Sequence, residues 1–173
     1  FNVPTPLVIG DKLLVSTENN GTRLYGFDAQ GRIIPRPLAC NTDLAPDTST
    51  PVVFQGMVFG VAERLYCLDL NDRLKTLWTA DAEPFGAYCS LIAGNGSVLV
   101  TSQLGLLCLV RASKTGYDRI SALDLFKGEP GTDKDTWSHP ALVGNRLYLR
   151  NLLGVNCVLF GVKLPAKAPP ARH

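Results

Sequence analysis

The feature of this sequence that most constrains its fold is a segment that recurs four times along the chain. Each copy starts with threonine, serine or histidine, continues as a short apolar run and ends in a turn that contains glycine; the copies are Thr5–Gly10, Thr50–Gly56, Ser90–Gly96 and His139–Asn145. Pro6 and Pro140 occupy the same position in the first and last copies, so the period is roughly 45 residues, which is typical of a propeller blade.

Two more apolar runs follow in each unit, which therefore has the pattern of a series of short strands. The second runs are Leu13–Val15, Met57–Phe59, Val98–Val100 and Leu147–Leu149, and the third runs are Leu24–Phe27, Leu65–Leu68, Leu106–Leu109 and Val155–Val158. A fourth run is visible in three units, at Arg32–Ile34, Lys75–Thr79 and Arg119–Leu125. Such runs, separated by glycine, asparagine and aspartate, are typical of hairpins, and no segment keeps a helical period.

These runs predict an all-β chain that folds as a β-propeller of four-stranded antiparallel blades. We place four blades at about 4–37, 49–79, 88–125 and 137–164, followed by a tail rich in proline and alanine over 165–173. Leucine-rich repeats are shorter than these units, and tetratricopeptide and ankyrin repeats are helical, so none of these classes fits.

The fourth unit differs from the others because it lacks an outer strand. The chain after Leu164 is rich in proline, which removes the N–H donors that a central strand needs. Phe1–Pro4 is too short to be a good substitute for that strand. We therefore expect this chain to be the C-terminal part of a larger ring, with eight blades as one option. A closed ring of four blades is the alternative.

Composition narrows the classes of partner. The chain has 173 residues, a one-domain length, of which 46% are hydrophobic and 18% charged, and this mixture excludes a disordered chain or a coiled coil. A formal net charge of +2 gives no reason to expect nucleic acid or an anionic membrane surface as a partner. No apolar run approaches the roughly 20 residues that a transmembrane helix needs.

The end of the second unit carries a motif that connects the repeat to a known family. Cys67-Leu68-Asp69 leads to Trp78 and is the best copy of the pattern A-x-D-x-x-T-G-x-x-x-W. Cysteine replaces alanine, Asp72-Arg73 replaces the Thr-Gly pair, and tryptophan comes one residue late. Gly26-Phe27-Asp28 is a weaker copy without tryptophan. The repeat resembles the pyrroloquinoline-quinone-like propeller repeat of quinoprotein alcohol dehydrogenases and of a bacterial outer-membrane assembly lipoprotein. Because the tryptophan motif is degenerate, we expect stability to depend more on leucine and valine packing.

The five cysteines have no CxxC spacing that would indicate a zinc ribbon or a haem site. In the alignment of the units Cys67, Cys108 and Cys157 fall at the position of Gly26, which predicts small, buried side chains, with a redox or metal role as the alternative. Cys89 should begin a first strand. Cys40 should lie in a loop as the most exposed thiol.

Acidic residues concentrate in the segments that link one blade to the next, at about 38–48, 80–87 and 126–136. The acids are Asp43, Asp47, Asp81, Glu83, Glu129, Asp133 and Asp135. Equivalent loops emerge on one side of a propeller, so these residues predict an acidic face that could bind cationic segments or divalent cations. The alternative is that these residues only give ordinary surface loops their polar character.

His139 stands where the other units have Thr5, Thr50 and Ser90, at the start of the innermost strand. Trp137 lies two residues before it. An imidazole next to an aromatic ring at the mouth of a propeller is a candidate site for a ligand or a metal. A histidine with a purely structural role is the alternative.

The resemblance implies a function but no catalytic residues. We expect a non-catalytic binding or scaffold propeller with a protein or polymer partner, located in the periplasm or elsewhere in the bacterial envelope. One alternative is part of a dehydrogenase that uses pyrroloquinoline quinone and calcium, whose binding residues cannot be mapped onto this chain, so we expect no cofactor. Another is a structural module that packs edge to edge with the remaining blades on another chain. GxGxxG, HExxH and GxSxG motifs are all missing.

Overall fold

The computed structural model describes residues 3–127 and 135–161, and all its regular elements within these ranges are strands. Blade 1 holds β1 (Leu7–Ile9), β2 (Lys12–Thr17), β3 (Gly21–Tyr25) and β4 (Ala39–Asn41). Blade 2 holds β5 (Val52–Phe54), β6 (Met57–Ala62), β7 (Arg64–Asp69) and β8 (Lys75–Ala80). Blade 3 holds β9 (Cys89–Gly94), β10 (Ser97–Ser102), β11 (Leu106–Arg111) and β12 (Arg119–Asp124), and blade 4 holds β13 (Ala141–Val143), β14 (Arg146–Arg150) and β15 (Val155–Leu159).

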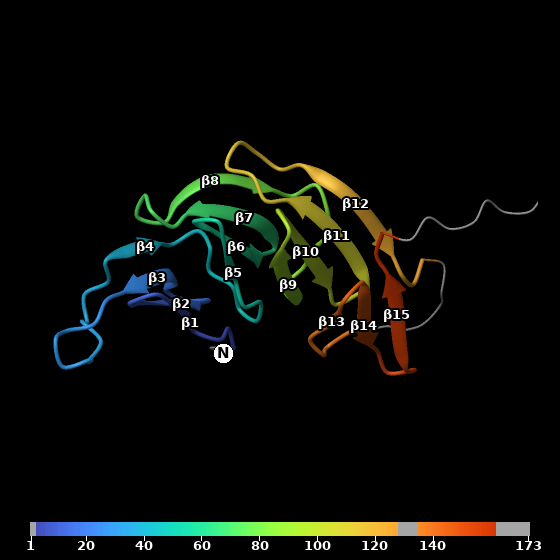
Figure 1. The fold of residues 1–173 in the computed structure, drawn as a ribbon, viewed down its shortest axis with the longest axis horizontal. Helices are drawn as coiled ribbons and strands as arrows, with labels where there is room; N and C mark the ends of the chain where they lie inside the picture. Colours follow the sequence, from blue (N-terminus) through green and yellow to red (C-terminus); the bar gives the residue numbers. More distant parts are fainter. Residues whose placement is uncertain (1–2, 128–134, 162–173) are drawn as a thin grey trace, which may run out of the picture.

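Each blade is one antiparallel sheet whose strands are paired in sequence order. The predicted all-β propeller of about four blades is therefore confirmed. In Figure 1 the blades follow one another along an open arc, with blade 1 at one end and blade 4 at the other. Blade 4 has three strands among the described residues, and the tail 165–173 lies outside them.

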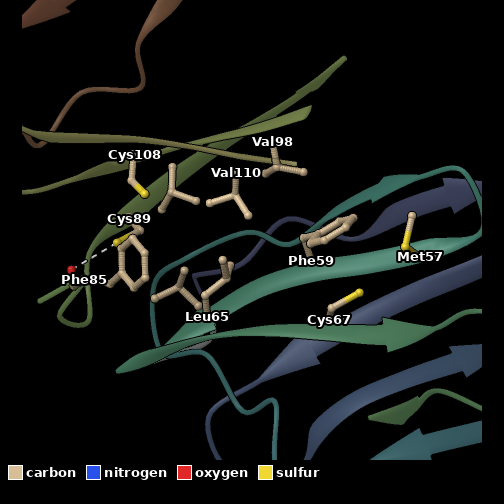
Figure 2. Close-up of a cluster of buried hydrophobic side chains, with 11 residues drawn as sticks. Met57, Phe59, Leu65, Cys67, Phe85, Cys89, Val98, Cys108 and Val110 are labelled. Carbon is tan, nitrogen blue, oxygen red and sulfur yellow. Dashed lines mark hydrogen bonds between the residues drawn. The ribbon is translucent and has the colours of Figure 1, made fainter. Parts of the chain in front are cut away.

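Three hydrophobic cores join successive blades, one core at each junction. The core between blades 1 and 2 contains Leu14, Leu24, Ala39, Leu44, Val58, Leu68 and Leu74. The core between blades 2 and 3, shown in Figure 2, includes Met57, Phe59, Leu65, Cys67, Phe85, Cys89, Val98, Cys108 and Val110. The core between blades 3 and 4 contains Leu99, Leu107, Leu147 and Leu149. Within the described ranges no such core joins blade 4 to blade 1, so a closed ring of four blades is wrong for this chain.

Trp78 connects blades 2 and 3 and shows that the motif keeps its role in the one unit that retains its tryptophan. Its indole N–H donates a hydrogen bond of 2.8 Å to the backbone carbonyl of Ser113. Its ring packs against Phe59 and Tyr117, with centroids 6.0 and 6.2 Å apart. Aromatic packing therefore contributes at this junction beside the leucine and valine side chains of its core.

The aspartates of the motif organise turns. One carboxylate oxygen of Asp28 accepts hydrogen bonds from the backbone N–H groups of Gln30 and Arg32, both 2.9 Å long. Asp69 accepts from the N–H of Asn71 and forms an ion pair of 2.8 Å with Lys114, which belongs to blade 3. The hydrogen bond from Lys114 holds the pKa of Asp69 below its ordinary value.

The outer strand of blade 1 lies further along the chain than the sequence predicted. The fourth run was expected at Arg32–Ile34, but this segment forms only an isolated bridge between Phe27 and Ile33, and β4 pairs with β3 instead. Pro35 and Pro37 interrupt the segment, and proline has no N–H to donate. The outer strands expected at Lys75–Thr79 and Arg119–Leu125 are confirmed by β8 and β12.

Two of the three aligned cysteines are buried as expected. Cys67 and Cys108 are fully buried, but they line the same core from opposite sides, because Cys67 belongs to blade 2 and Cys108 to blade 3. Cys157 is exposed, so its predicted burial is wrong. The reason is that it lies on the outward face of blade 4, opposite Tyr148 in the ladder, and no further blade covers that face in this structure. Cys40 is exposed as expected, although it lies in β4 rather than in a loop.

Thiol labelling should separate these residues into two groups. Burial raises the pKa of Cys67 and of Cys89 to about 12, and it also raises the pKa of Cys108, so these thiols are protonated as well as shielded. We expect only Cys40 and Cys157 to react with a maleimide near neutral pH in the native protein, and all five to react after denaturation. Fast labelling of Cys108, read by peptide mass spectrometry, would contradict this packing.

Candidate functional site

The links between blades and the turns between second and third strands meet on one face of the arc. The N–H of Gln103, in the β10–β11 turn, donates to the carbonyl of Tyr88, and the N–H of Thr136 donates to the carbonyl of Gln103 at 2.7 Å. Glu63, in the β6–β7 turn, pairs with Gly86 of the link between blades 2 and 3. The expected gathering of these loops is therefore found, and they surround the starts of the first strands.

A small cavity of about 130 Å³ lies at this place, and we call it the axial hollow. Val3, Thr48, Tyr88 and Trp137 line it, one from each blade, and each lies two residues before the residue that begins the repeat. The other lining residues are Cys89, Ser90, Thr101, Thr136 and His139. The hollow therefore forms where all four repeats converge.

The aromatic side chains at the hollow contact each other. The rings of Tyr88 and Trp137 lie with centroids 4.6 Å apart and planes at 79°, an edge-to-face arrangement that aromatic pairs favour. Both remain accessible, since Tyr88 is 40% and Trp137 56% exposed. Large aromatic side chains in such half-open positions are enriched at sites that bind proteins and other ligands.

His139 makes a hydrogen bond across the junction between blades 3 and 4. Its Nδ1 lies 3.0 Å from Oγ of Ser90, which is the equivalent residue of the neighbouring repeat. In the same way, the N–H of Thr5 donates to Oγ1 of Thr50 at 3.0 Å between blades 1 and 2. His139 thus forms one of the hydrogen bonds that join neighbouring blades, and it is also exposed at the edge of the hollow.

A second, more open hollow of about 320 Å³ lies on the other side of Trp137. Asp135, Arg150 and Leu152 line it. Leu152 and its neighbour Leu153, in the β14–β15 turn, are 69% and 72% exposed. Trp137 therefore separates two hollows, and apolar surface continues beyond the second one.

The structure places the residues of the predicted acidic face in different surroundings. Asp43 and Asp81 are exposed, and Asp47 is half-buried. Asp135 is half-buried and accepts a hydrogen bond of 3.1 Å from the amide of Gln103. Asp133 and Glu129 lie outside the described residues.

Glu83 does not contribute to an open acidic surface. Its side chain is only 9% exposed, it forms an ion pair with Arg119, and it accepts a hydrogen bond from the hydroxyl of Tyr117. The same hydroxyl lies 3.5 Å from the sulfur of Cys108, and burial raises the pKa of the Tyr117 phenol. Glu83 forms a structural ion pair between blades 2 and 3, because Arg119 compensates its charge and its side chain is mostly buried.

The described residues offer no clustered ligands for the calcium ion of the site that the resemblance implies. Among the described residues no group of three or more histidine, cysteine, aspartate or glutamate side chains is placed to hold a metal ion. His139 bonds to a serine, and Glu83 to an arginine. We therefore derive no reaction step through such a cofactor. No helix in the described part of the chain could span a membrane.

Comparison with known proteins gives structural likenesses only. No protein-family model and no curated protein matches the sequence. BamB from Moraxella catarrhalis is similar with a TM-score of 0.63 and 16% identity, over 90% of this chain and 43% of that one. The quinohemoprotein alcohol dehydrogenase ADHIIG from Pseudomonas putida HK5 is similar with a TM-score of 0.58 and 17% identity, over 86% of this chain and 28% of that one. A europium-containing methanol dehydrogenase is similar with a TM-score of 0.53 and 15% identity, over 84% of this chain and 34% of that one.

These likenesses confirm, at the level of the fold, the resemblance that the repeat indicated. The chain spans 43% of the length of BamB and 28% of the length of the alcohol dehydrogenase. Similarity of fold carries no activity with it, since one fold supports many functions. The function has to be argued from the site.

Sequence reasoning identified Trp137 and His139 but missed their partners. Tyr88 and Ser90 complete the site, and they stand in the third repeat where Trp137 and His139 stand in the fourth. An aromatic residue two positions before the start of the repeat, present in two successive units, is the signal that would have found them.

Proposed function

We propose that this chain is a non-catalytic binding β-propeller, or part of one, that presents the axial hollow and its rim to a protein partner. The observation that carries the proposal is the exposed pair of Tyr88 and Trp137 at the convergence of the blades. Aromatic anchors with a polar surround are the usual energetic centre of protein interfaces. The likeness to the propeller of BamB supports an envelope location as part of the same proposal.

Selection of peptides from a random display library tests the proposal, because a random library samples many sequences without assuming a particular partner. We expect peptides selected on the native chain to bind at least tenfold more weakly to Trp137→Ala, a loss of about 1.4 kcal/mol. Leu123→Ala is the matched control, because Leu123 is 49% exposed on β12, the outer strand of blade 3. Unchanged binding to the tryptophan variant would overturn the proposal.

The dehydrogenase alternative predicts a different result. A chain purified from its natural source would then carry a quinone absorbance, and it would oxidise alcohols only with calcium present. A binding propeller shows neither property, and the peptide experiment gives the same answer with or without calcium.

A further inference from the structure

The threonine hydroxyl hydrogens at the axial hollow are already used inside the protein. A threonine hydroxyl has one hydrogen to donate and two lone pairs to accept with. Thr48 donates its hydrogen to the carbonyl of Ala87 at 2.7 Å. Thr101 donates to the carbonyl of Ser90 at 3.3 Å. What these two side chains retain for a ligand is therefore acceptor capacity.

The same holds for two more residues that line the hollow. Thr136 donates its hydroxyl hydrogen at 2.9 Å to the carbonyl of Gln103, and the thiol of Cys89 donates to the carbonyl of Phe85 at 3.1 Å. Burial also raises the pKa of Cys89, which keeps that hydrogen in place. The three threonine hydroxyls thus retain lone pairs, and a ligand that offers donors matches them, whereas the sulfur of Cys89 belongs to the core behind the hollow.

The aromatic pair favours the same kind of ligand. The face of an indole or phenol ring carries partial negative charge and attracts a cation, most strongly when water is partly excluded. The half-exposed rings of Tyr88 and Trp137 stand beside the acceptors. A cavity of about 130 Å³ has room for the end of one long side chain.

We propose that the axial hollow binds the cationic end of a lysine or arginine side chain of a protein partner. This inference rests on the proposed function and names the chemistry of the residue that the hollow selects. In either tautomer of His139, one hydrogen lies between Ser90 and His139 and a second hydrogen of the pair is left over. This second hydrogen can be donated to a carbonyl of the partner's backbone.

Nuclear magnetic resonance of the two indole N–H groups tests the inference in the full chain. Trp137 reports on the hollow, and Trp78, bonded to Ser113 between blades, is an internal control. The probes are the blocked tripeptides acetyl-Gly-Lys-Gly-amide and acetyl-Gly-Arg-Gly-amide. The comparison peptide has norleucine in place of lysine, which keeps the carbon chain and removes the charge.

We expect the lysine or the arginine peptide to shift the Trp137 signal in a saturable way and to leave the Trp78 signal in place. The norleucine peptide should bind at least tenfold more weakly. Thr48→Val, which keeps the shape and removes the acceptor, should weaken binding severalfold, whereas Leu123→Ala should not change it.

Equal binding of the norleucine peptide, or no shift of the Trp137 signal with either cationic peptide, would overturn the inference. Neither result would overturn the proposed function, which the library experiment decides by itself. If library peptides depend on Trp137 but carry no lysine or arginine, the surface binds a partner by another chemistry. If they do not depend on Trp137, the proposed function fails as well.

Discussion

Replacing Trp78 with alanine should lower the free energy of unfolding by about 3 kcal/mol, as measured by urea denaturation. The variant loses the packing against Phe59 and Tyr117 and the indole hydrogen bond to Ser113. It also leaves a void beside the core between blades 2 and 3. Because this junction is the centre of the arc, we expect the whole chain to lose stability rather than one blade alone.

Two variants control this result. Trp78→Phe keeps an aromatic ring and removes the hydrogen bond, so it should cost clearly less than alanine. Trp137→Ala removes the same side chain from a position that is 56% exposed, so it should cost only the edge-to-face contact with Tyr88, about 1 kcal/mol. Equal losses at Trp78 and Trp137 would contradict the packing described above.

Replacing Gly21 with alanine should be at least as damaging, by about 3 kcal/mol or more. Gly21 has a φ of +68°, which other residues adopt at a cost. A Cβ atom there would lie 2.2 Å from the backbone oxygen of Asn41, so β3 and β4 would have to separate. Backbone atoms cannot rotate away as the end of a side chain can, and the outer strand of blade 1 would be lost.

Gly10→Ala is the matched control for this prediction. Gly10 has a φ of +59°, but a Cβ atom there has no neighbour within 4 Å. Gly10→Ala should therefore lower the free energy of unfolding by only about 1 kcal/mol, the cost of a positive φ for alanine. Equal losses in the two variants would mean that the contact with Asn41 does not matter. If circular dichroism of Gly21→Ala shows that only part of the strand content is lost, this result would support the account.

The period and the strand pattern were enough to predict the fold, because each blade is built by local hairpins. The prediction of the outer strand failed in blade 1, where Pro35 and Pro37 move it to β4. Cys157 shows another limit. Its position in the repeat indicated burial, but burial also depends on the neighbouring blade, which a single repeat does not describe.

The site was only half predictable for a similar reason. Trp137 and His139 stood out as unusual residues, whereas Tyr88 and Ser90 gain their meaning from contacts between repeats. The charge of Glu83 suggested an acidic surface, yet Arg119 compensates it from the outer strand of the next blade. Residue types predict which groups are present, and only the packing of the blades decides which of them face a ligand.

Hydrogen–deuterium exchange with a peptide selected from the library tests the central claim, that the axial hollow is the binding surface, most directly. The account predicts slower exchange at 86–90, 101–104 and 135–139, the segments that carry the hollow, and no change in β4 or β12. Protection confined to the open faces of blade 1 or blade 4 would contradict it, because the partner would then bind as a neighbouring blade does.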